Sequence, residues 1–273
     1  MSEAIITDSE LNKHFALKKE EIAFYGERGY IKLKNVFTSD ELAHYGEVIT
    51  KQVIRLNEQD KPLEDRDTYG KAFLQVMNLW TKSDVIKQFV FGKRLAGIAA
   101  ELMEVDGVRL YHDQALYKEG GGGYTPWHAD QYYWPLKTPK TITAWIPLQK
   151  ITLEMGALEF SAGSHTLDLG RDLAISDNSE SIIDAALSSS DFEHVVEPYD
   201  LGEVSFHSGW AYHRASPNTT DSARRVMCII YMDEDMRLKK PSNEHQQADW
   251  DAWCPGARIG EIVDTPQNPV LFP

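Results

Sequence analysis

Cysteine and long apolar runs are both scarce in this 273-residue sequence. The two cysteines, Cys228 in an apolar run and Cys254 in a polar tail, form neither a metal-binding pair nor a disulfide framework, and we expect both to be structural. No run approaches the roughly 18 apolar residues of a membrane span, and Met1–Lys19 lacks the apolar core of a signal peptide. We therefore predict a cytoplasmic protein that does not insert into a membrane.

Basic residues are also few, since 28 Lys and Arg stand against 42 Asp and Glu and give a net charge of -14. The acidic residues are scattered along the chain, which argues against nucleic acid or an anionic membrane as a partner. The 42% hydrophobic content allows one large domain or two small ones. We expect a single domain over residues 1–273, and the sequence leaves its oligomeric state open.

The N-terminal part, about residues 1–107, has mainly helical signals. A predicted helix over Lys18–Arg28 ends at Gly29, Tyr30–Lys34 alternates like a short strand, and Thr38–Glu41 supplies capping residues for a helix to about Leu56. Helical patterning returns over residues 84–91 and 93–103.

The composition changes over residues 108–235, where short segments rich in β-branched and aromatic residues alternate with turn residues. The predicted strands are Val108–Lys118, Thr141–Leu148, Met155–Phe160, His194–Glu197, Glu203–His207 and Arg225–Met232. Several strands at this spacing predict a sandwich or barrel of the jelly-roll kind. The expected fold class is mainly β with N-terminal helices.

Three segments show little periodicity. Asn57–Tyr69 is charged and is expected to be a solvated loop at the edge of the active-site mouth. Asp168–Asp191 is a polar, serine-rich insertion that could be a surface excursion or a lid. The C-terminal tail, residues 236–273, contains Trp250 and Trp253, which indicate that it packs on the body of the protein.

The strongest chemical signal is His128-Ala129-Asp130. On one extended strand, His128 and Asp130 project from the same face and can converge on one metal ion. His213 could supply a third ligand. Two imidazoles and one carboxylate form the facial triad of non-haem Fe(II) oxygenases, which leaves coordination positions open for a cosubstrate and dioxygen.

A cation follows the distal histidine. Pro217–Ser222 has turn chemistry, so His213 and Arg224 are predicted to lie on neighbouring strands and to face one cavity. A guanidinium there would bind one end of a dicarboxylate cosubstrate while the other end chelates iron. Arg225 is predicted to point to the opposite face and to form a salt bridge.

These residues resemble the pattern of the phytanoyl-CoA dioxygenase family of Fe(II)/2-oxoglutarate-dependent oxygenases, and the resemblance extends along most of the chain. Besides the His128-Ala129-Asp130 motif, His213 and Arg224, the matching motifs are Phe24-Tyr25, Gly29-Tyr30, Asp113–Lys118, Gly156–Leu158, Gly163–His165 and Gly202-Glu203. The sequence departs from many relatives at Ala215, where they have a small hydroxyl residue; Ser216 follows it here.

The resemblance implies a double-stranded β-helix, which is a cupin-like jelly-roll. The implied Fe(II) ligands are His128, Asp130 and His213, and the residues implied to contact 2-oxoglutarate are Arg224, Gln114 and Trp145. The implied reaction consumes O2, hydroxylates a small-molecule metabolite and releases succinate and CO2. Halogenating relatives have a small residue where this chain has Asp130, so hydroxylation is favoured over halogenation. The sequence shows no basic patch for CoA phosphates, which favours a free metabolite over an acyl-CoA.

Other interpretations stay open. His207 is the rival third ligand, although we expect it to be a structural histidine on the same strand as His213. The same three ligands could activate water in a metal-dependent hydrolase, but Arg224 would then have no role. A non-catalytic jelly-roll binding protein is the third alternative.

Five aromatic residues flank the ligand pair and are candidates for the wall of the substrate pocket: Tyr124, Trp127, Tyr132, Tyr133 and Trp134. Aromatic faces bind both apolar bodies and cationic groups, so this cluster alone does not identify the substrate.

Overall fold

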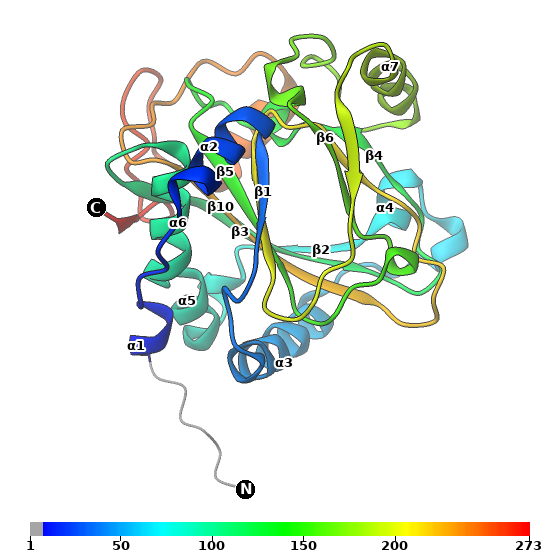
Figure 1. Cartoon of the computed structure of the whole chain (residues 1–273), viewed down its shortest axis with the longest axis horizontal. Helices are drawn as coiled ribbons and strands as arrows, with labels where there is room; N and C mark the ends of the chain where they lie inside the picture. The colour runs from blue at the N-terminus through cyan, green and yellow to red at the C-terminus, as the bar shows by residue number, and fades with distance from the viewer. Residues whose placement is uncertain (1–7) are drawn as a thin grey trace, which may run out of the picture.

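The computed structural model describes residues 8–273, and its strands form two antiparallel sheets (Figure 1). The seven-stranded sheet has the order β1-β8-β5-β10-β3-β11, with β2 also paired to β3, and the four-stranded sheet has the order β4-β9-β6-β7. The larger sheet contains β1 (Tyr30–Leu33), β2 (Leu74–Met77), β3 (Val108–Lys118), β5 (Thr141–Pro147), β8 (Val204–Ser208), β10 (Arg224–Asp233) and β11 (Val270–Phe272). The smaller sheet contains β4 (Thr125–His128), β6 (Leu158–Ala162), β7 (Glu193–Val196) and β9 (His213–Ala215). The predicted jelly-roll is confirmed, with its two sheets left open instead of closed into a barrel.

Within residues 8–273, eight α-helices lie around the two sheets. They are α1 (Asp8–Leu11), α2 (Lys19–Arg28), α3 (Ser39–Leu56), α4 (Thr68–Ala72), α5 (Asp84–Val90), α6 (Lys93–Met103), α7 (Asp177–Ser188) and α8 (Glu244–Trp253). Helix α6 contacts four strands of the larger sheet, whereas α7 contacts β4 of the smaller sheet (Figure 1). Within residues 8–273, every helix is too short or too polar to cross a membrane.

Local signals explain the ends of two N-terminal helices. Helix α2 ends at Gly29, whose φ of 73° lies in the left-handed region that favours glycine. At the start of α3, the Thr38 side chain accepts a hydrogen bond from the Glu41 backbone, and the Glu41 side chain accepts one from the Thr38 backbone. Both boundaries agree with the sequence predictions.

Strand β10 shows how the sheet separates two cores. Met227, Ile229 and Tyr231 belong to the apolar cluster beneath the N-terminal helices. The alternate residues Cys228 and Ile230 belong to the cluster between the two sheets. Since side chains alternate along a strand, Arg224 shares the inner face with Cys228, and Arg225 lies on the outer face.

Two segments contain more regular structure than predicted. The polar insertion at Asp168–Asp191 contains the helix α7, which is packed against the smaller sheet. The tail, expected to have little periodicity, contains α8 and β11. The tail does pack on the body, as predicted, since the Gln246 side chain donates a hydrogen bond of 2.8 Å to the Tyr132 carbonyl.

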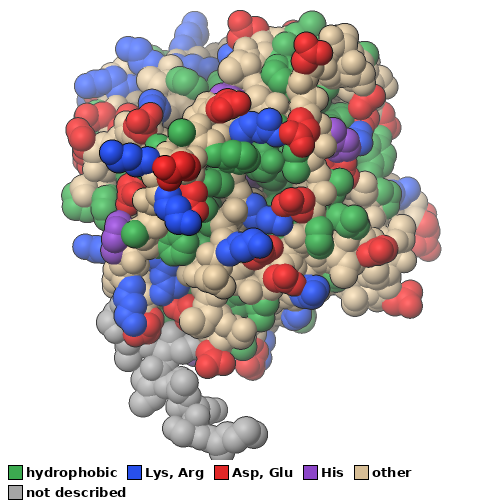
Figure 2. Space-filling view, in the orientation of Figure 1, with side chains coloured by type: hydrophobic (Ala, Val, Ile, Leu, Met, Phe, Trp, Pro, Cys, Tyr) green, Lys and Arg blue, Asp and Glu red, His purple; other side chains and the backbone are tan. Residues whose placement is uncertain are grey.

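Charged side chains of both signs are interspersed over the face shown in Figure 2. Most therefore have solvent or an opposite charge nearby, and isolated surface pairs of this kind contribute little to stability. The pair formed by Glu41 and Arg94 is different because it is buried, with Glu41 only 3% exposed. Arg94 Nη2 lies 2.9 Å from Glu41 Oε1, and Arg94 Nη1 also donates to the Val36 carbonyl.

Replacing Glu41 with Gln should lower the free energy of unfolding by about 3 kcal/mol, because it leaves the Arg94 guanidinium buried without a counter-charge. Urea unfolding followed by circular dichroism measures the change. The matched control is Glu47→Gln on the same helix, which removes only an exposed pair with Lys51 and should leave the unfolding midpoint in place. Equal midpoints for the two variants would show that the buried pair does not stabilise the fold.

Candidate active site

Three predicted metal ligands converge where β4 meets β9. His128 is the last residue of β4, and it pairs in register with His213, the first residue of β9. Asp130 begins a 3-10 helix, Asp130–Tyr133, so the prediction that it shares a strand with His128 is wrong. Ala129 between them remains extended, with φ -124° and ψ 127°, which still directs both side chains to the same side.

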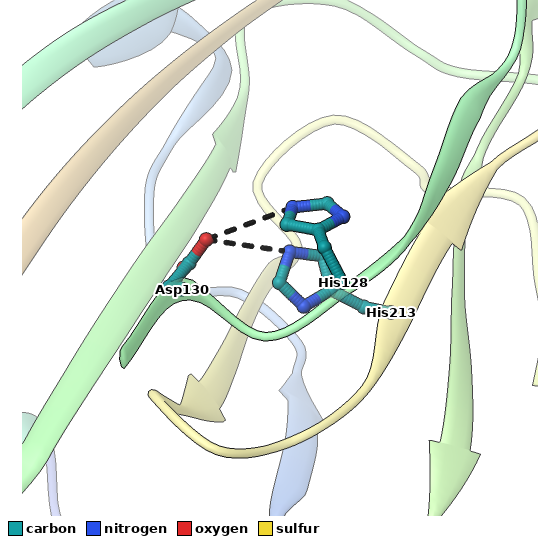
Figure 3. Close-up of side chains that lie close together, drawn as sticks. All are labelled: His128, Asp130 and His213. Atoms are coloured by element: carbon teal, nitrogen blue, oxygen red, sulfur yellow. Dashed lines mark ion pairs between the residues drawn. The ribbon is translucent and has the colours of Figure 1, made fainter. Parts of the chain in front are cut away.

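The donor atoms of this group are close enough to bind one ion. His128 Nε2 and His213 Nε2 each lie 3.7 Å from Asp130 Oδ1, and the three donor atoms lie within 4.8 Å of one another (Figure 3). Metal bonds of roughly 2.1 Å can span such separations with little movement. The arrangement is therefore suited to one first-row metal ion.

Backbone carbonyls orient both imidazoles. His128 Nδ1 lies 2.8 Å from the Pro126 carbonyl, and His213 Nδ1 lies 3.0 Å from the Ala211 carbonyl. A carbonyl can only accept, so each Nδ1 carries the proton and each Nε2 keeps a free lone pair. Hydrogen bonds of this kind fix the tautomer that a metal requires.

The second oxygen of Asp130 is held on the other side. Asp130 Oδ2 accepts a hydrogen bond of 3.0 Å from Thr143 Oγ1 and lies 3.3 Å from His207 Nε2. These contacts leave Oδ1 facing the two histidines. His207 lies on β8, not on the strand of His213 as predicted, and it falls outside the converging group of donor atoms.

Protonation states in the site also favour metal binding. Burial, followed by repulsion from a neighbouring histidine, lowers the pKa of His128 and of His213 to about 4. Burial alone would raise the pKa of Asp130, but His213 and the hydrogen bond with His207 outweigh it and lower that pKa. At neutral pH the site therefore offers two neutral imidazoles and one carboxylate.

Arg224 reaches the same cavity from the opposite sheet. Strand β10 belongs to the larger sheet and β9 to the smaller one, so the prediction that His213 and Arg224 lie on neighbouring strands is wrong. The two residues nevertheless line one cavity. The expectation for Arg225 is partly wrong: it lies on the other face, but it donates a hydrogen bond of 2.6 Å to the Gln149 side chain instead of forming a salt bridge.

The Arg224 guanidinium is buried without a counter-charge. It donates to the Gly156 carbonyl, and its carbon lies 5.4 Å from the ring centre of Trp145. Its Nε has no hydrogen-bond partner, and within residues 8–273 no carboxylate forms an ion pair with it. Burial lowers the pKa of Arg224 to about 10, which leaves it charged at neutral pH. A dicarboxylate would supply the missing partner.

The sequence analysis missed a second buried basic residue in this region. Lys118 pairs in register with Arg224 and is fully buried, and its amine donates to the Gly123 carbonyl. Burial, followed by repulsion from Arg224, lowers the pKa of Lys118 to about 6. Its position at the end of a strand, just before the glycine run, was the only signal in the sequence.

The cavity has a volume of about 300 Å³. Of the predicted residues, those that line it are His128, Asp130, His213, Arg224, Gln114, Trp145, Tyr133 and Trp134. Further lining residues that the sequence analysis did not propose for the cavity wall are Phe73, Ile175, Asp249 and Trp253, and Tyr69 ends the segment expected at the edge of the active-site mouth. Most of these lie on helices and loops outside the jelly-roll core, which is why strand patterning did not identify them.

Three of the predicted aromatic residues lie outside the lining, so their expected place in the cavity wall is corrected. The Tyr124 hydroxyl donates to Asp177 at the start of α7. Trp127 packs in the cluster between α7 and the smaller sheet, and its indole nitrogen donates to Asp184 at 3.2 Å. The ring of Tyr132 packs against Tyr133, with centroids 4.9 Å apart.

Two facing sheets that hold a His-Asp-His site opposite an unpaired arginine are features of the non-haem iron, 2-oxoglutarate-dependent dioxygenases. The model of one such family, "Phytanoyl-CoA dioxygenase (PhyH)", matches residues 25–226. The chain therefore belongs to the phytanoyl-CoA dioxygenase family, which confirms the resemblance drawn from its motifs.

Individual relatives are distant in sequence. A probable alpha-ketoglutarate-dependent hypophosphite dioxygenase of Stutzerimonas stutzeri is 22% identical over 221 residues, 76% of each chain. The non-heme alpha ketoglutarate dependent carbocyclase SnoK from nogalamycin biosynthesis is 25% identical, with a TM-score of 0.75 over 93% of this chain and 96% of that one. EctD from S. alaskensis, solved with 2-oxoglutarate and 5-hydroxyectoine, is 21% identical, with a TM-score of 0.70 over 90% of this chain and 85% of that one.

The hydrogen bond from Thr143 to Asp130 can be tested by metal binding. Thr143→Val removes the hydroxyl at nearly constant volume and should weaken Fe(II) affinity about tenfold, because Asp130 is no longer held with Oδ1 toward the histidines. Thr143→Ser keeps the hydroxyl and should retain the affinity. Anaerobic Fe(II) titration measures both, and identical affinities for the Val and Ser variants would rule out this role.

Proposed function

We propose that this protein is an Fe(II)- and 2-oxoglutarate-dependent dioxygenase that hydroxylates a small-molecule metabolite and releases succinate and CO2. The observation that carries the proposal is the pairing, across one cavity, of the His128, Asp130 and His213 group with the unpaired Arg224. A metal-dependent hydrolase or a non-catalytic binding protein would need the ligands but would leave the buried cation without a role. Family membership supports the same conclusion.

Bound iron and 2-oxoglutarate would supply the oxidising chemistry, in which O2 oxidises both the cosubstrate and a substrate C–H bond. The chain supplies binding and orientation. His128, Asp130 and His213 would hold the metal, and Arg224 would bind the distal carboxylate of 2-oxoglutarate through parallel hydrogen bonds. Gln114 and Trp145, which line the cavity, would contact the cosubstrate along its length.

Asp130 supports hydroxylation over halogenation. A carboxylate at this position fills a coordination site that a halide would otherwise take. Solved structures with a similar fold include enzymes named carbocyclase and epimerase. Identification of the reaction product is therefore needed to distinguish hydroxylation from ring closure or epimerisation. The site also draws on residues from Tyr69 to Trp253, which supports our proposal of one catalytic domain over residues 1–273.

Adding 2-oxoglutarate anaerobically to the Fe(II)-loaded protein should produce the weak visible charge-transfer band of a chelated 2-oxo acid. His128→Ala and His213→Ala should each abolish the band, because two ligands do not retain the metal in this geometry. Exposure to O2 should then yield succinate, measured by mass spectrometry, and a substrate product heavier by one oxygen. A fully iron-loaded protein without the band would exclude this function and favour the hydrolase or binding-protein alternatives.

The two adjacent arginines provide a matched test of the cosubstrate site. Arg224→Ala should weaken 2-oxoglutarate binding by about 2 kcal/mol or more, roughly 30-fold, because it removes the charged partner of the distal carboxylate. Arg225→Ala removes an equal charge from the outer face, where the side chain contacts Gln149, and should leave the affinity unchanged. Titration of the charge-transfer band gives the dissociation constant of 2-oxoglutarate for each variant. Equal losses of affinity in the two variants would show that the cosubstrate arginine is misassigned.

A further inference from the structure

The cavity contains a carboxylate that the cofactor chemistry does not use. Asp249 lies on α8, and together with Asp130 it provides the acidic side chains of the lining. Helix α8 contacts the 3-10 helix that begins at Asp130, so the C-terminal segment closes one side of the cavity. The tail therefore contributes a charge to the site as well as packing on the body.

Asp249 is held in place but has no basic side chain paired with it among the described residues. Its Oδ2 accepts a hydrogen bond of 2.9 Å from the Tyr111 hydroxyl. Within residues 8–273, no Lys, Arg or His forms an ion pair with it. Burial raises the pKa of Asp249 to about 7, against the opposing effect of hydrogen bonds from Tyr111 and Trp253. A carboxylate in this environment is stabilised by any ligand that brings a positive charge.

The neighbouring residue His112 does not supply that charge. The ring of His112 packs 5.4 Å from Trp253 and 5.0 Å from Tyr111, the residue that donates to Asp249. Burial lowers the pKa of His112 to about 4, so its imidazole is neutral at pH 7. Asp249 therefore keeps an unbalanced charge whenever it is ionised.

Aromatic rings line the same cavity. Trp253 lies one turn after Asp249 on α8, so the two side chains share a helix face. The other aromatic side chains of the lining outside the cosubstrate site are Tyr69, Phe73, Tyr133 and Trp134. Aromatic faces alone accept apolar or cationic groups, but aromatic faces beside an unpaired carboxylate favour a cation.

The cavity lining thus carries charges of both signs on different elements. Arg224 on β10 provides the positive charge for an anionic cosubstrate, while Asp249 on α8 provides a negative charge. An anionic substrate would meet the carboxylates of Asp249 and Asp130, and a neutral one would leave Asp249 unbalanced. The net charge of -14 also favours the approach of cations.

We propose that Asp249 is a substrate-binding residue and that the substrate carries a protonated amino group, held against Asp249 and the aromatic rings beside it. The proposal rests on the proposed dioxygenase function, since it names the substrate class of that same site. The cavity of about 300 Å³ must also hold the cosubstrate, so the amine is a small one.

The test uses small amines matched with compounds of the same carbon skeleton. Benzylamine, 2-phenylethylamine and cyclohexylmethylamine are each compared with the corresponding alcohol and carboxylate. Binding to the anaerobic Fe(II) and 2-oxoglutarate complex is measured by the shift of the charge-transfer band, and binding to the metal-free protein by calorimetry. At least one amine should bind roughly 10- to 100-fold more tightly than its two counterparts, the difference expected of a charge-assisted hydrogen bond.

Asp249→Asn keeps the size of the side chain and an acceptor for Tyr111, and it should abolish the preference for the amine. Asp251→Asn, an exposed change on the same helix, should retain it. Near-ultraviolet circular dichroism checks that both variants fold. If Asp249→Asn does not fold, the comparison of each amine with its alcohol and carboxylate in the unaltered protein still tests the preference for amines.

Three results would overturn the proposal: no amine binds better than its alcohol, a carboxylate binds as well, or the preference survives in Asp249→Asn. A charge-transfer band without any preference for amines would reject this inference alone. Absence of the band would reject the dioxygenase function itself, and calorimetry on the metal-free protein would still decide whether Asp249 binds amines.

Discussion

The site depends on the burial of a guanidinium that has no carboxylate partner in the described chain. Arg224 is only 2% exposed, and a buried charge is costly unless something compensates it. Part of the compensation is built in: the Gly156 carbonyl accepts one hydrogen bond, and the Trp145 ring lies beside the guanidinium. Gly156 has a φ of 72°, and a Cβ there would approach the Ser216 carbonyl to 2.2 Å, so glycine is required for this close approach. The rest of the compensation is left to a bound dicarboxylate.

The sequence predicted the chemistry of the site better than its topology. The spacing of His128 and Asp130, the distal His213 and the adjacent Arg224 and Arg225 were enough to predict which side chains converge and which strand face each arginine takes. The assignment of His213 and Arg224 to neighbouring strands failed because a short polar turn looks the same within a hairpin as between two sheets. Only the long-range pairing of β9 with β4 and β6, and of β10 with β3 and β5, separates these cases. Pairing between distant segments leaves no local pattern.

Helices α7 and α8 were harder to predict for a related reason. Helix α8 is polar along most of its length and buries few side chains, so it lacks an apolar stripe. A signal did exist in its cap, since Asn243 accepts a hydrogen bond of 2.8 Å from the Gln246 backbone. In α7, Ile183 and Leu187 are buried against Trp127, and Glu180 accepts from the Trp127 backbone. The serine-rich insertion thus supports the outer side of the strand that carries His128.

In this arrangement, the residues proposed to bind the substrate and those proposed to bind the cofactors lie on different elements. His128, His213 and Arg224 lie on strands whose register the two sheets fix, and Asp130 lies in the 3-10 helix just after β4, whereas Asp249 and Trp253 lie on a peripheral helix. A change in α8 can alter the charge and shape presented to a substrate without shifting the pairing of β4 with β9. Conversely, the ligand geometry tolerates little change, because His128 and His213 are each held by a carbonyl two residues earlier in their own chain segment. Cofactor binding is therefore determined by the sheets, and substrate selection by the segments that close the cavity over them.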